Sequence, residues 1–281
     1  MKIKLGVIIL CCLAVYTFSC SESEQGKTGK DPSVTKYVYK KWWRLRPFLV
    51  KDKWGYRTKG RKKVIIPPQF EFAELFCEGL ARIKIGGKEA YINVTGKIIS
   101  ELLFERVFPY SEGLAAVKVV DRLGFIVFRS RYGYIDITGE LVIKPEYDVG
   151  FDFADGLAAV RIGDMFGYIS KTGEMMIEPQ FIWAETFSEG RAAVMIEDKY
   201  GYIDRTGEIV IEPRFIWADP FSEGLASVNV GGKWGYIDKT GKITIEPEFD
   251  WACPFWKGKA MVRIKGRQQY IDNPSADNKG K

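Results

Sequence analysis

The chain has 281 residues, with 42 Lys and Arg against 36 Asp and Glu, a formal net charge of +6 and no histidine. Without histidine, Ser-His-Asp and Cys-His catalysis are excluded and the commonest zinc ligand is missing, although carboxylate chemistry remains open. Hydrophobic residues make up 46% of the chain, enough for a sizeable core, and 29 glycines indicate many turns. The charge excess is too small to indicate a nucleic-acid partner.

The N-terminus resembles a bacterial lipoprotein signal. Two lysines precede an almost wholly apolar run over residues 5–18, which is shorter than a typical membrane span. The run ends in Ser19-Cys20, and in such signals the cysteine after a small residue is acylated and becomes the mature N-terminus. The resemblance implies a signal peptide over residues 1–19 and a lipid anchor on Cys20. It also implies a place in the bacterial cell envelope, with the outer membrane or cell surface favoured over the periplasm. An ordinary secretion signal and an uncleaved anchor are the alternatives.

Two short segments precede the main part of the chain, and one follows it. Residues 20–36 are rich in Ser, Glu, Gly and Lys and have no aromatic side chain, so we predict a disordered tether. Residues 37–53 are basic and aromatic, and we predict an N-terminal cap that buries its aromatics against the first repeat. Contact of this segment with a lipid interface is the alternative. Residues 273–281 are predicted to form a disordered tail.

Residues 54–272 contain an internal repeat. The tyrosine of an aromatic-Gly-Tyr-Ile motif falls at positions 56, 91, 134, 168, 202, 236 and 270, and the last four intervals are each 34 residues. The glycine of a second motif, Glu-Gly-Leu-Ala, falls at 79, 113, 156, 190, 224 and 258. Two landmarks with one period indicate six repeats and a partial seventh.

The repeats depart from the pattern at three places. A third landmark, Ile-x-Pro-x-Phe, has Leu102 in place of its proline in repeat two and a double proline, Pro67-Pro68, in repeat one. The interval between Tyr91 and Tyr134 is 43 residues, which locates a nine-residue insertion in about 118–131. We predict an extended hairpin or a projecting loop at this insertion.

The motif over residues 233–241, Lys-Trp-Gly-Tyr-Ile-Asp-Lys-Thr-Gly, is similar to the signature of the bacterial WG (Trp-Gly) repeat family. The Ile-x-Pro-x-Phe landmark belongs to the same signature, and the resemblance covers roughly residues 54–272. Repeats of this kind occur in many bacterial envelope proteins. The resemblance therefore implies a family and a setting, but it implies no particular activity.

The fifth repeat, residues 200–233, illustrates the predicted strands. Residues 200–204, 208–212 and 225–230 are expected to be extended, and the proline at 213 stops the second strand because it cannot donate to a ladder. Three strands of about five residues per repeat, with no helical period, predict an all-β fold.

One repeat cannot bury its own aromatic side chains, so neighbouring repeats must stack. We predict tandem three-stranded β repeats of about 34 residues, stacked as an open, solenoid-like array. The alternative is a closed β-propeller of six or seven blades, for which residues 46–50 and 269–272 would supply complementary half-units. A disulfide between Cys77 and Cys253 would require the closed ring, because these residues lie in repeats one and six.

Acidic residues recur at two places in the repeat. The aspartate before Thr-Gly, such as Asp204, is interpreted as a turn residue, because Asp readily bonds the backbone ahead of it. A second set precedes the turn glycine of the Glu-Gly motif, where Lys257 replaces the acid in repeat six. We interpret this set as turn and surface residues, because catalytic residues should be singular rather than periodic. Its members are Glu78, Glu112, Asp155, Glu189 and Glu223.

Trp183, Trp217 and Trp251 occupy the same place in consecutive repeats, each before an alanine. If these rings face solvent, they could stack on sugar rings or on apolar groups of a partner, which makes them the candidate ligand-binding residues. A phenylalanine precedes each of them by two residues and should share its face in an extended strand. This spacing favours the alternative, in which the tryptophans belong to the core.

The sequence therefore predicts a lipid-anchored binding or scaffold module of the cell envelope that contacts a protein or glycan partner. The alternative is a carboxylate-dependent enzyme acting on envelope glycans, which would need two acids about 5–9 Å apart. No such acid pair stands out in the sequence. We expect no catalytic residue, no cofactor, no metal and no nucleic-acid partner.

Overall fold

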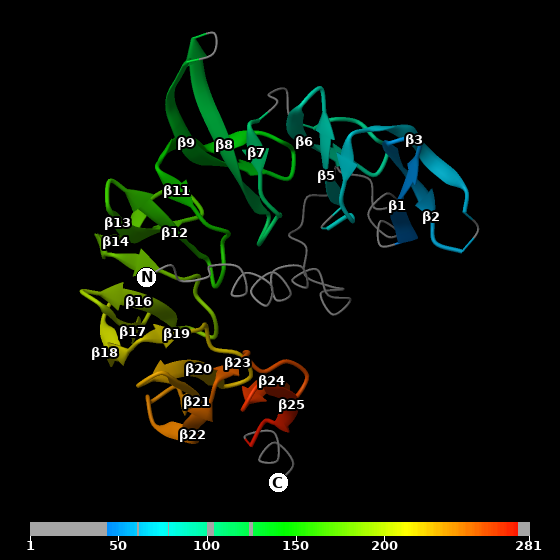
Figure 1. Cartoon of the computed structure of the whole chain (residues 1–281). Coiled ribbons are helices and arrows are strands. Elements are labelled where there is room, and N and C mark those ends of the chain that lie inside the picture. The colour runs from blue at the N-terminus through cyan, green and yellow to red at the C-terminus, as the bar shows by residue number, and fades with distance from the viewer. Residues whose placement is uncertain (1–43, 61, 78, 100–103, 124–125, 275–281) are drawn as a thin grey trace, which may run out of the picture. The chain divides into compact units, whose positions relative to one another are not determined.

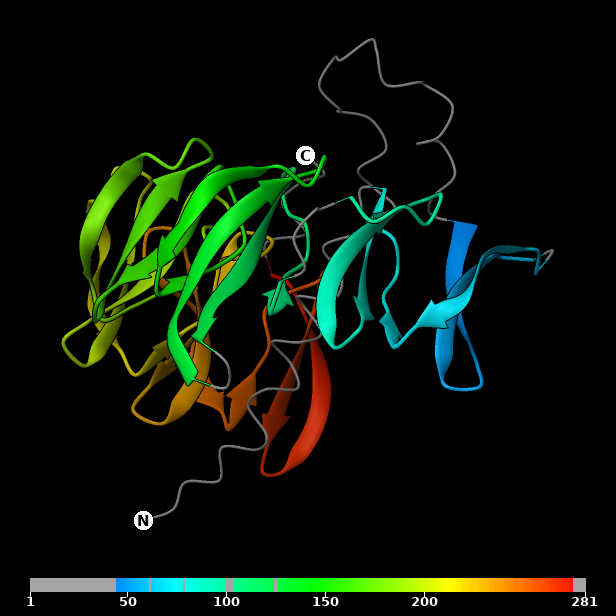
Figure 2. The ribbon, with the colours of Figure 1, turned by 90° about the horizontal axis from the view of Figure 1, so that it is seen from above.

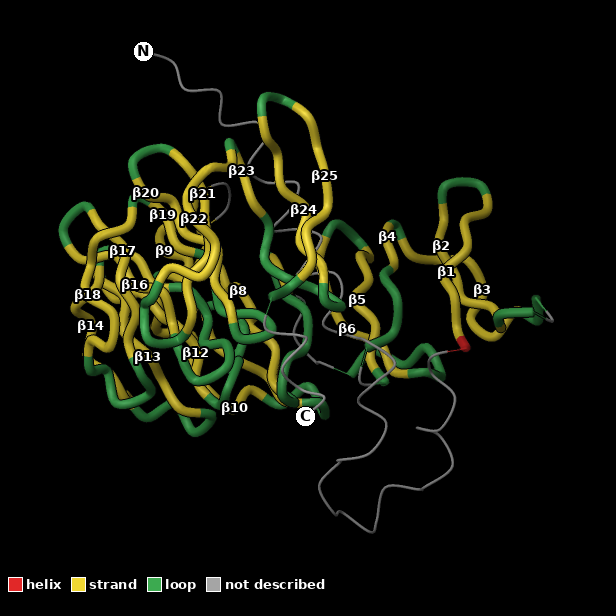
Figure 3. The backbone as a smooth tube through the Cα atoms, turned by 90° about the horizontal axis from the view of Figure 1, so that it is seen from below, coloured by secondary structure: helices red, strands yellow, loops and turns green. Residues whose placement is uncertain are grey.

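A computed structural model describes residues 44–274, except residues 61, 78, 100–103 and 124–125. Several predicted features lie outside the described residues: the signal peptide, Cys20, the tether, residues 37–43 of the cap, Glu78, Leu102 and all but the first two residues of the tail. The described part of the chain is all-β, as predicted, and consists of strands joined by short turns (Figure 3). It contains no helix long and apolar enough to cross a membrane.

The chain divides into two compact units, Met1–Glu146 and Tyr147–Lys281, which are described separately. The first unit contains three antiparallel sheets in chain order (Figure 1). Their strands are β1 (Leu45–Val50), β2 (Lys53–Thr58) and β3 (Val64–Phe70); β4 (Phe72–Ala73), β5 (Leu80–Ile85) and β6 (Lys88–Asn93); and β7 (Arg106–Val107), β8 (Leu114–Leu123), β9 (Ile126–Asp136) and β10 (Leu141–Tyr147).

The second unit contains four further sheets, which lie side by side in chain order (Figures 1 and 2). Three of them have four strands and the last has three. The strands are β11 (Val149–Gly150), β12 (Leu157–Ile162), β13 (Met165–Ser170) and β14 (Met175–Phe181); β15 (Trp183–Ala184), β16 (Ala192–Ile196), β17 (Lys199–Ile203) and β18 (Ile209–Phe215); β19 (Trp217–Ala218), β20 (Leu225–Val230), β21 (Lys233–Asp238) and β22 (Ile243–Phe249); and β23 (Trp251–Ala252), β24 (Lys259–Ile264) and β25 (Arg267–Asp272).

The three predicted strands are present in five of the six repeats, and the structure adds a fourth strand of two residues. In repeat two, the described residues of the second predicted strand form isolated bridges. In the sheet β15-β16-β17-β18, the two-residue strand β15 pairs with β16 through Trp183↔Met195 and Ala184↔Val194. Two residues are too few to show an alternating pattern, so this strand left no signal in the sequence. The prediction of three strands per repeat is therefore one strand short of these four-stranded sheets.

The predicted turn chemistry is confirmed at Asp204. Its Oδ1 accepts hydrogen bonds from the backbone N–H of Thr206 at 2.9 Å, the hydroxyl of Thr206 at 2.6 Å and the N–H of Glu208 at 3.1 Å. Asp136 and Asp238 make the same three bonds. In these three repeats the bonds hold the turn between the first and second strand, and the turn glycine after Asp204, Gly207, has φ +90°.

The insertion at 118–131 is an extended hairpin, as predicted. Strands β8 and β9 have 10 and 11 residues and pair along their whole length, from Leu114↔Asp136 to Leu123↔Ile126. In the neighbouring repeat, the equivalent strands β12 and β13 have six residues each. The longest hairpin in Figure 1 is this one.

Hydrophobic residues from adjacent sheets form shared clusters in the second unit, as the stacking argument requires. One cluster joins Phe166 and Phe181 of one sheet to Phe187 and Val194 of the next. Buried tyrosines also form hydrogen bonds between adjacent sheets. The Tyr168 hydroxyl donates to the backbone carbonyl of Glu185 at 2.7 Å. Equivalent bonds run from Tyr202 to Asp219 and from Tyr236 to Cys253. The recurring tyrosine therefore both fills the core and ties one sheet to the next.

The predicted half-units at the two ends are present as strands. Residues 46–50 lie in β1, which pairs with β2, and residues 269–272 lie in β25, which pairs with β24.

Candidate functional site

The structure places the three candidate tryptophans in equivalent positions of the second unit. Trp183, Trp217 and Trp251 begin β15, β19 and β23, which are the first strands of three successive sheets. Trp183 is 36% exposed, and the other two are half-buried. The alanine after each tryptophan is buried, at 0–1% exposure. We call these three residues the tryptophan row.

The argument from spacing, which put each tryptophan on the core face with its preceding phenylalanine, is wrong for Trp183. Phe181 is 2% exposed, whereas Trp183 is 36% exposed. The chain bends at Ile182, whose N–H donates to Met195 at 3.0 Å, and so leaves β14 for the next sheet. Because the strand does not continue straight through this bend, the alternation of side chains is broken between residues 181 and 183.

Each of the first two rings of the row packs on an aromatic ring of the preceding sheet. The centroid of Trp183 lies 5.3 Å from that of Phe166 in β13, and the centroid of Trp217 lies 5.3 Å from that of Tyr200 in β17. In the third member, the guanidinium carbon of Arg263 lies 5.9 Å from the ring centroid of Trp251. These contacts fix the rings in orientation while part of each ring stays accessible.

Two carboxylates lie beside the row. The indole N–H of Trp183 donates to Glu185 Oε1 at 2.8 Å, and that of Trp217 donates to Asp219 Oδ1 at 3.0 Å. The hydroxyl of Ser227 donates to the other oxygen of Asp219 at 2.6 Å. Each acid therefore holds its tryptophan in place by a charge-assisted hydrogen bond.

Burial shifts the titration of both acids. Burial raises the pKa of Asp219 to about 6, against the lowering effect of its bonds from Ser227 and Trp217, and the nearby Glu185 carboxylate raises it further. Burial also raises the pKa of Glu185, while the bond from Trp183 lowers it. The two carboxylates thus belong to one electrostatic group on adjacent repeats.

Sequence reasoning missed this acid pair, although a signal existed. The position two residues after the tryptophan, or after its equivalent, is acidic in three of the six repeats, as Glu74, Glu185 and Asp219, and is Phe108, Phe151 or Cys253 in the others. Glu185 and Asp219 lie in consecutive repeats, each two residues after a tryptophan of the row, and that combination was the feature to look for.

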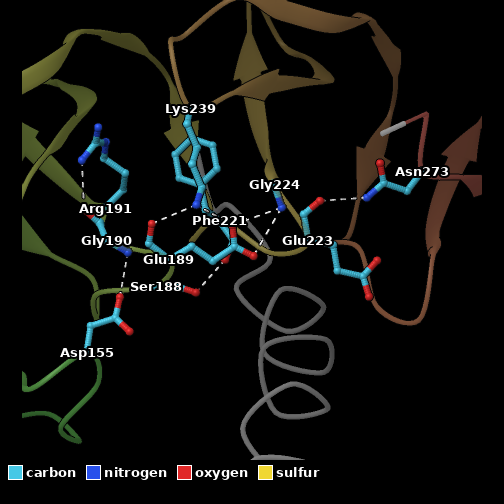
Figure 4. Close-up of polar contacts among 10 residues, drawn as sticks. All are labelled: Asp155, Ser188, Glu189, Gly190, Arg191, Phe221, Glu223, Gly224, Lys239 and Asn273. Carbon is cyan, nitrogen blue, oxygen red and sulfur yellow. Dashed lines mark hydrogen bonds and ion pairs between the residues drawn. The ribbon is translucent and has the colours of Figure 1, made fainter. Parts of the chain in front are cut away.

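The periodic acids before the turn glycine have a structural role instead. Asp155 accepts a hydrogen bond at 2.7 Å from the N–H of Gly190, the equivalent glycine one repeat further on (Figure 4). Glu189 accepts one from Gly224 at 3.1 Å, and Glu223 accepts one from Gly258 at 2.8 Å. The interpretation as turn residues holds for these acids, since their φ values are 51° to 54°. They also link each sheet to the next, and we call them the turn latches.

Further polar contacts reinforce the turn latches. Lys239 Nζ contacts both the backbone oxygen and the carboxylate of Glu189 at 3.0 Å, and the Ser188 hydroxyl donates to the carbonyl of Phe221 at 2.6 Å (Figure 4). At the end of the series, the side-chain amide of Asn273 donates to the carbonyl of Glu223 at 3.0 Å. Across the described ranges, no group of three or more acids or cysteines is arranged to hold a metal ion.

A family model described as "WG containing repeat" matches residues 54–88, 90–121, 132–165, 166–200, 200–234 and 234–267, which is more than half of the chain. The chain belongs to the WG repeat family. No curated protein sequence matches the chain significantly.

Several solved structures have a backbone that is partly similar to that of this chain. AztD of Citrobacter koseri is 15% identical, with a TM-score of 0.43, over 83% of this chain and 76% of that one. Hsv2 of Kluyveromyces lactis is 10% identical, with a TM-score of 0.47, over 72% of each chain. The extracellular domain of the putative one component system BT4673 from B. thetaiotaomicron is 10% identical, with a TM-score of 0.40. That match covers 82% of this chain and 39% of the other.

The WG repeats and the sheets are offset from each other along the chain. The repeat over residues 166–200 contains the end of one sheet, β13 and β14, and the start of the next, β15 and β16. The last three WG repeats therefore each pass from one sheet to its neighbour at the bend that precedes a tryptophan of the row. The candidate site lies at these crossing points.

Proposed function

We propose that this WG repeat protein is a binding module of the bacterial cell envelope, lipid-anchored through Cys20, and that the tryptophan row contacts its partner. The observation that carries the proposal is the state of Trp183. Its ring is packed on Phe166 and bonded to Glu185, yet 36% of its surface is exposed. A ring held in this way loses little conformational freedom on binding, which favours affinity.

A surface polysaccharide is the partner that this geometry supports best. Aromatic faces stack on the apolar faces of sugar rings, and carboxylates accept hydrogen bonds from sugar hydroxyls. Glu185 and Asp219 place such acceptors beside two of the rings. A protein partner with exposed apolar groups is the second candidate for the same surface.

Binding is tested with a soluble fragment, residues 37–281, applied to envelope extracts and glycan arrays. The triple variant Trp183→Ala, Trp217→Ala, Trp251→Ala should lose retention, and its fold is checked by thermal unfolding. Trp256→Ala is the matched control, because Trp256 is 54% exposed and lies outside the row. Unchanged retention by a folded triple variant would reject the proposal.

Anchoring is tested separately in cells. Cys20→Ser should release the protein from the membrane fraction, because the thioether that carries the lipid can no longer form. Persistent attachment of this variant would overturn the lipid anchor without affecting the proposal on binding.

A carboxylate-dependent glycan-acting enzyme is the second candidate function, and the Glu185–Asp219 pair favours it. Glycoside hydrolysis uses one acid of raised pKa together with a second carboxylate, and Asp219 has a raised pKa to which the Glu185 carboxylate contributes. Release of reducing ends from bound polysaccharide, lost in Asp219→Asn and Glu185→Gln alike, would establish this function. Binding of the polysaccharide without release of reducing ends would reject the enzyme and leave the binding module as the proposed function.

A further inference from the structure

The last strand of the array, β25, has an open edge. In the three preceding sheets the equivalent strands, β13, β17 and β21, each pair with a further strand on their outer side. Among the described residues, no strand pairs with that side of β25. Residues 267–270 are exposed, and Tyr270 is 71% exposed. An exposed strand edge is a template for pairing with another chain.

The crossing strand passes very close to the glycine of the strand beside it. A Cβ at Gly167 would lie 2.4 Å from the carbonyl oxygen of Ile177 and 2.8 Å from the nitrogen of Pro179. A Cβ at Gly201 would lie 2.6 Å from the carbonyl oxygen of Ile211, and a Cβ at Gly235 would lie 2.6 Å from that of Ile245. These neighbours are backbone atoms rather than flexible side chains, so they cannot move aside without breaking the sheet. The glycine of the Trp-Gly motif therefore lets the Ile-x-Pro-x-Phe strand run close to the backbone, and a large side chain at this position would collide with that strand.

Gln269 occupies the position of this glycine in β25. Gly167 pairs with Val160, Gly201 with Val194 and Gly235 with Val228, and the residue in β25 that pairs with the equivalent Val262 is Gln269. The register is the same in all four sheets, so the comparison does not depend on the sequence alignment. A side chain at this position points where the crossing strand would run.

Repeat two shows how a small side chain behaves at this position. Its residue is Ala90, which pairs with Ile83 in the register of the other sheets. The chain after β6 bridges to it at Ile92↔Ile98 and Glu89↔Phe104, the equivalents of Ile169↔Met175 and Phe166↔Phe181, and residues 100–103 between these bridges lie outside the described residues. One methyl group therefore permits the crossing at both of its ends, whereas the side chain of Gln269 is much larger. The strands β2 with Gly55 and β9 with Gly133 keep the glycine, and each pairs with a crossing strand, β3 or β10.

We propose that Gln269 closes the edge of β25 against a further WG repeat and so ends the array. The partner that it excludes is the Ile-x-Pro-x-Phe strand of a second copy of this chain that is not yet folded. Each chain carries several such strands, and each could otherwise add to the exposed edge. Gln269 thus protects the end of the array from the addition of strands by other copies.

The test uses a labelled synthetic peptide that covers residues 241–252, which contains β22 with its preceding turn. Its binding to the 37–281 chain is followed by fluorescence anisotropy for the wild type and for Gln269→Gly. We expect Gln269→Gly to bind the peptide at least five-fold more tightly, because the crossing strand can then approach the backbone.

Gln268→Gly is the matched control, since it also removes an exposed side chain from β25 but leaves Gln269 in place. It should bind the peptide as the wild type does. A gain of less than five-fold in Gln269→Gly, including no binding to any variant, would overturn the proposal. An equal gain in Gln268→Gly would also overturn it, because the effect would then come from general loosening of the edge.

Discussion

At the scale of single residues, each position of the WG motif meets a separate physical demand. Gly201 allows β18 to cross at close range, Tyr202 bonds the next sheet through its hydroxyl, and Asp204 holds the following turn. The sequence predicts the role of Asp204, because turn chemistry is local. It does not predict the role of Gly201, because the crossing strand lies ten residues further on and approaches only in the folded sheet.

Gly201→Ala tests the close crossing. The added Cβ would lie 2.6 Å from the carbonyl oxygen of Ile211, so the sheet must open locally. We expect a loss of about 2–4 kcal/mol in the free energy of unfolding, measured by urea denaturation. The reverse change, Ala90→Gly, should cost no more than about 1 kcal/mol, because it removes only a methyl group. Equal losses in the two variants would contradict the explanation.

Asp219 makes stability depend on pH. Its pKa of about 6 in the folded chain lies above that of an ordinary aspartate, so the folded state binds the proton more tightly than the unfolded state does. Its contribution to stability is therefore fully present below about pH 4 and is lost as the pH rises to about 6. Asp219→Asn keeps the acceptor for Trp217 and should remove this part of the pH dependence.

The measurement is the free energy of unfolding of wild type and Asp219→Asn between pH 4 and pH 8. The difference between them should change by about 1–2 kcal/mol across this interval, in favour of the variant at high pH. Glu174→Gln, a change at an exposed turn acid, serves as the control. A difference that stays constant with pH would show that the carboxyl group titrates normally.

At the scale of elements, the sequence predicts the long strands and the turns but not the position of the tryptophans. Alternating residues and recurring glycines mark the strands of each repeat, and the 43-residue interval marks the long hairpin of β8 and β9. The bend at Ile182 and the two-residue strand β15 leave no periodic signal. The exposure of Trp183 could therefore be found only in the folded chain.

Glu189→Ala tests the turn latches. This change removes the acceptor for the N–H of Gly224 and the ion pair with Lys239, and we expect a loss of about 1–2 kcal/mol in the free energy of unfolding. Glu197→Ala is a close control, because Glu197 has nearly the same φ, 55° against 54°, in an exposed hairpin turn. Glu197→Ala should lower the free energy of unfolding by less than about 0.5 kcal/mol. Similar losses at both positions would mean that backbone conformation, and not the latch, sets the cost.

At the scale of the whole molecule, the motif over residues 233–241 indicates the family by resemblance, and three extended segments in each 34-residue repeat predict the all-β fold. Every WG repeat passes from one sheet to the next, so shared clusters, tyrosine hydroxyls and turn latches all act between neighbours. The function is less accessible to sequence reasoning, because repetition makes each structural residue recur. The features that depart from the repeat are the informative ones: the tryptophan row in three repeats, the acids Glu185 and Asp219, and Gln269 in β25.

The central claim is that the tryptophan row is the binding surface, and isothermal titration calorimetry with a polysaccharide retained by the 37–281 chain tests it most directly. The triple variant at Trp183, Trp217 and Trp251 should bind at least about 100-fold more weakly, because each stacked ring contributes roughly 1 kcal/mol or more. Trp256→Ala should bind as the wild type does. Wild-type affinity in a folded triple variant would contradict the account.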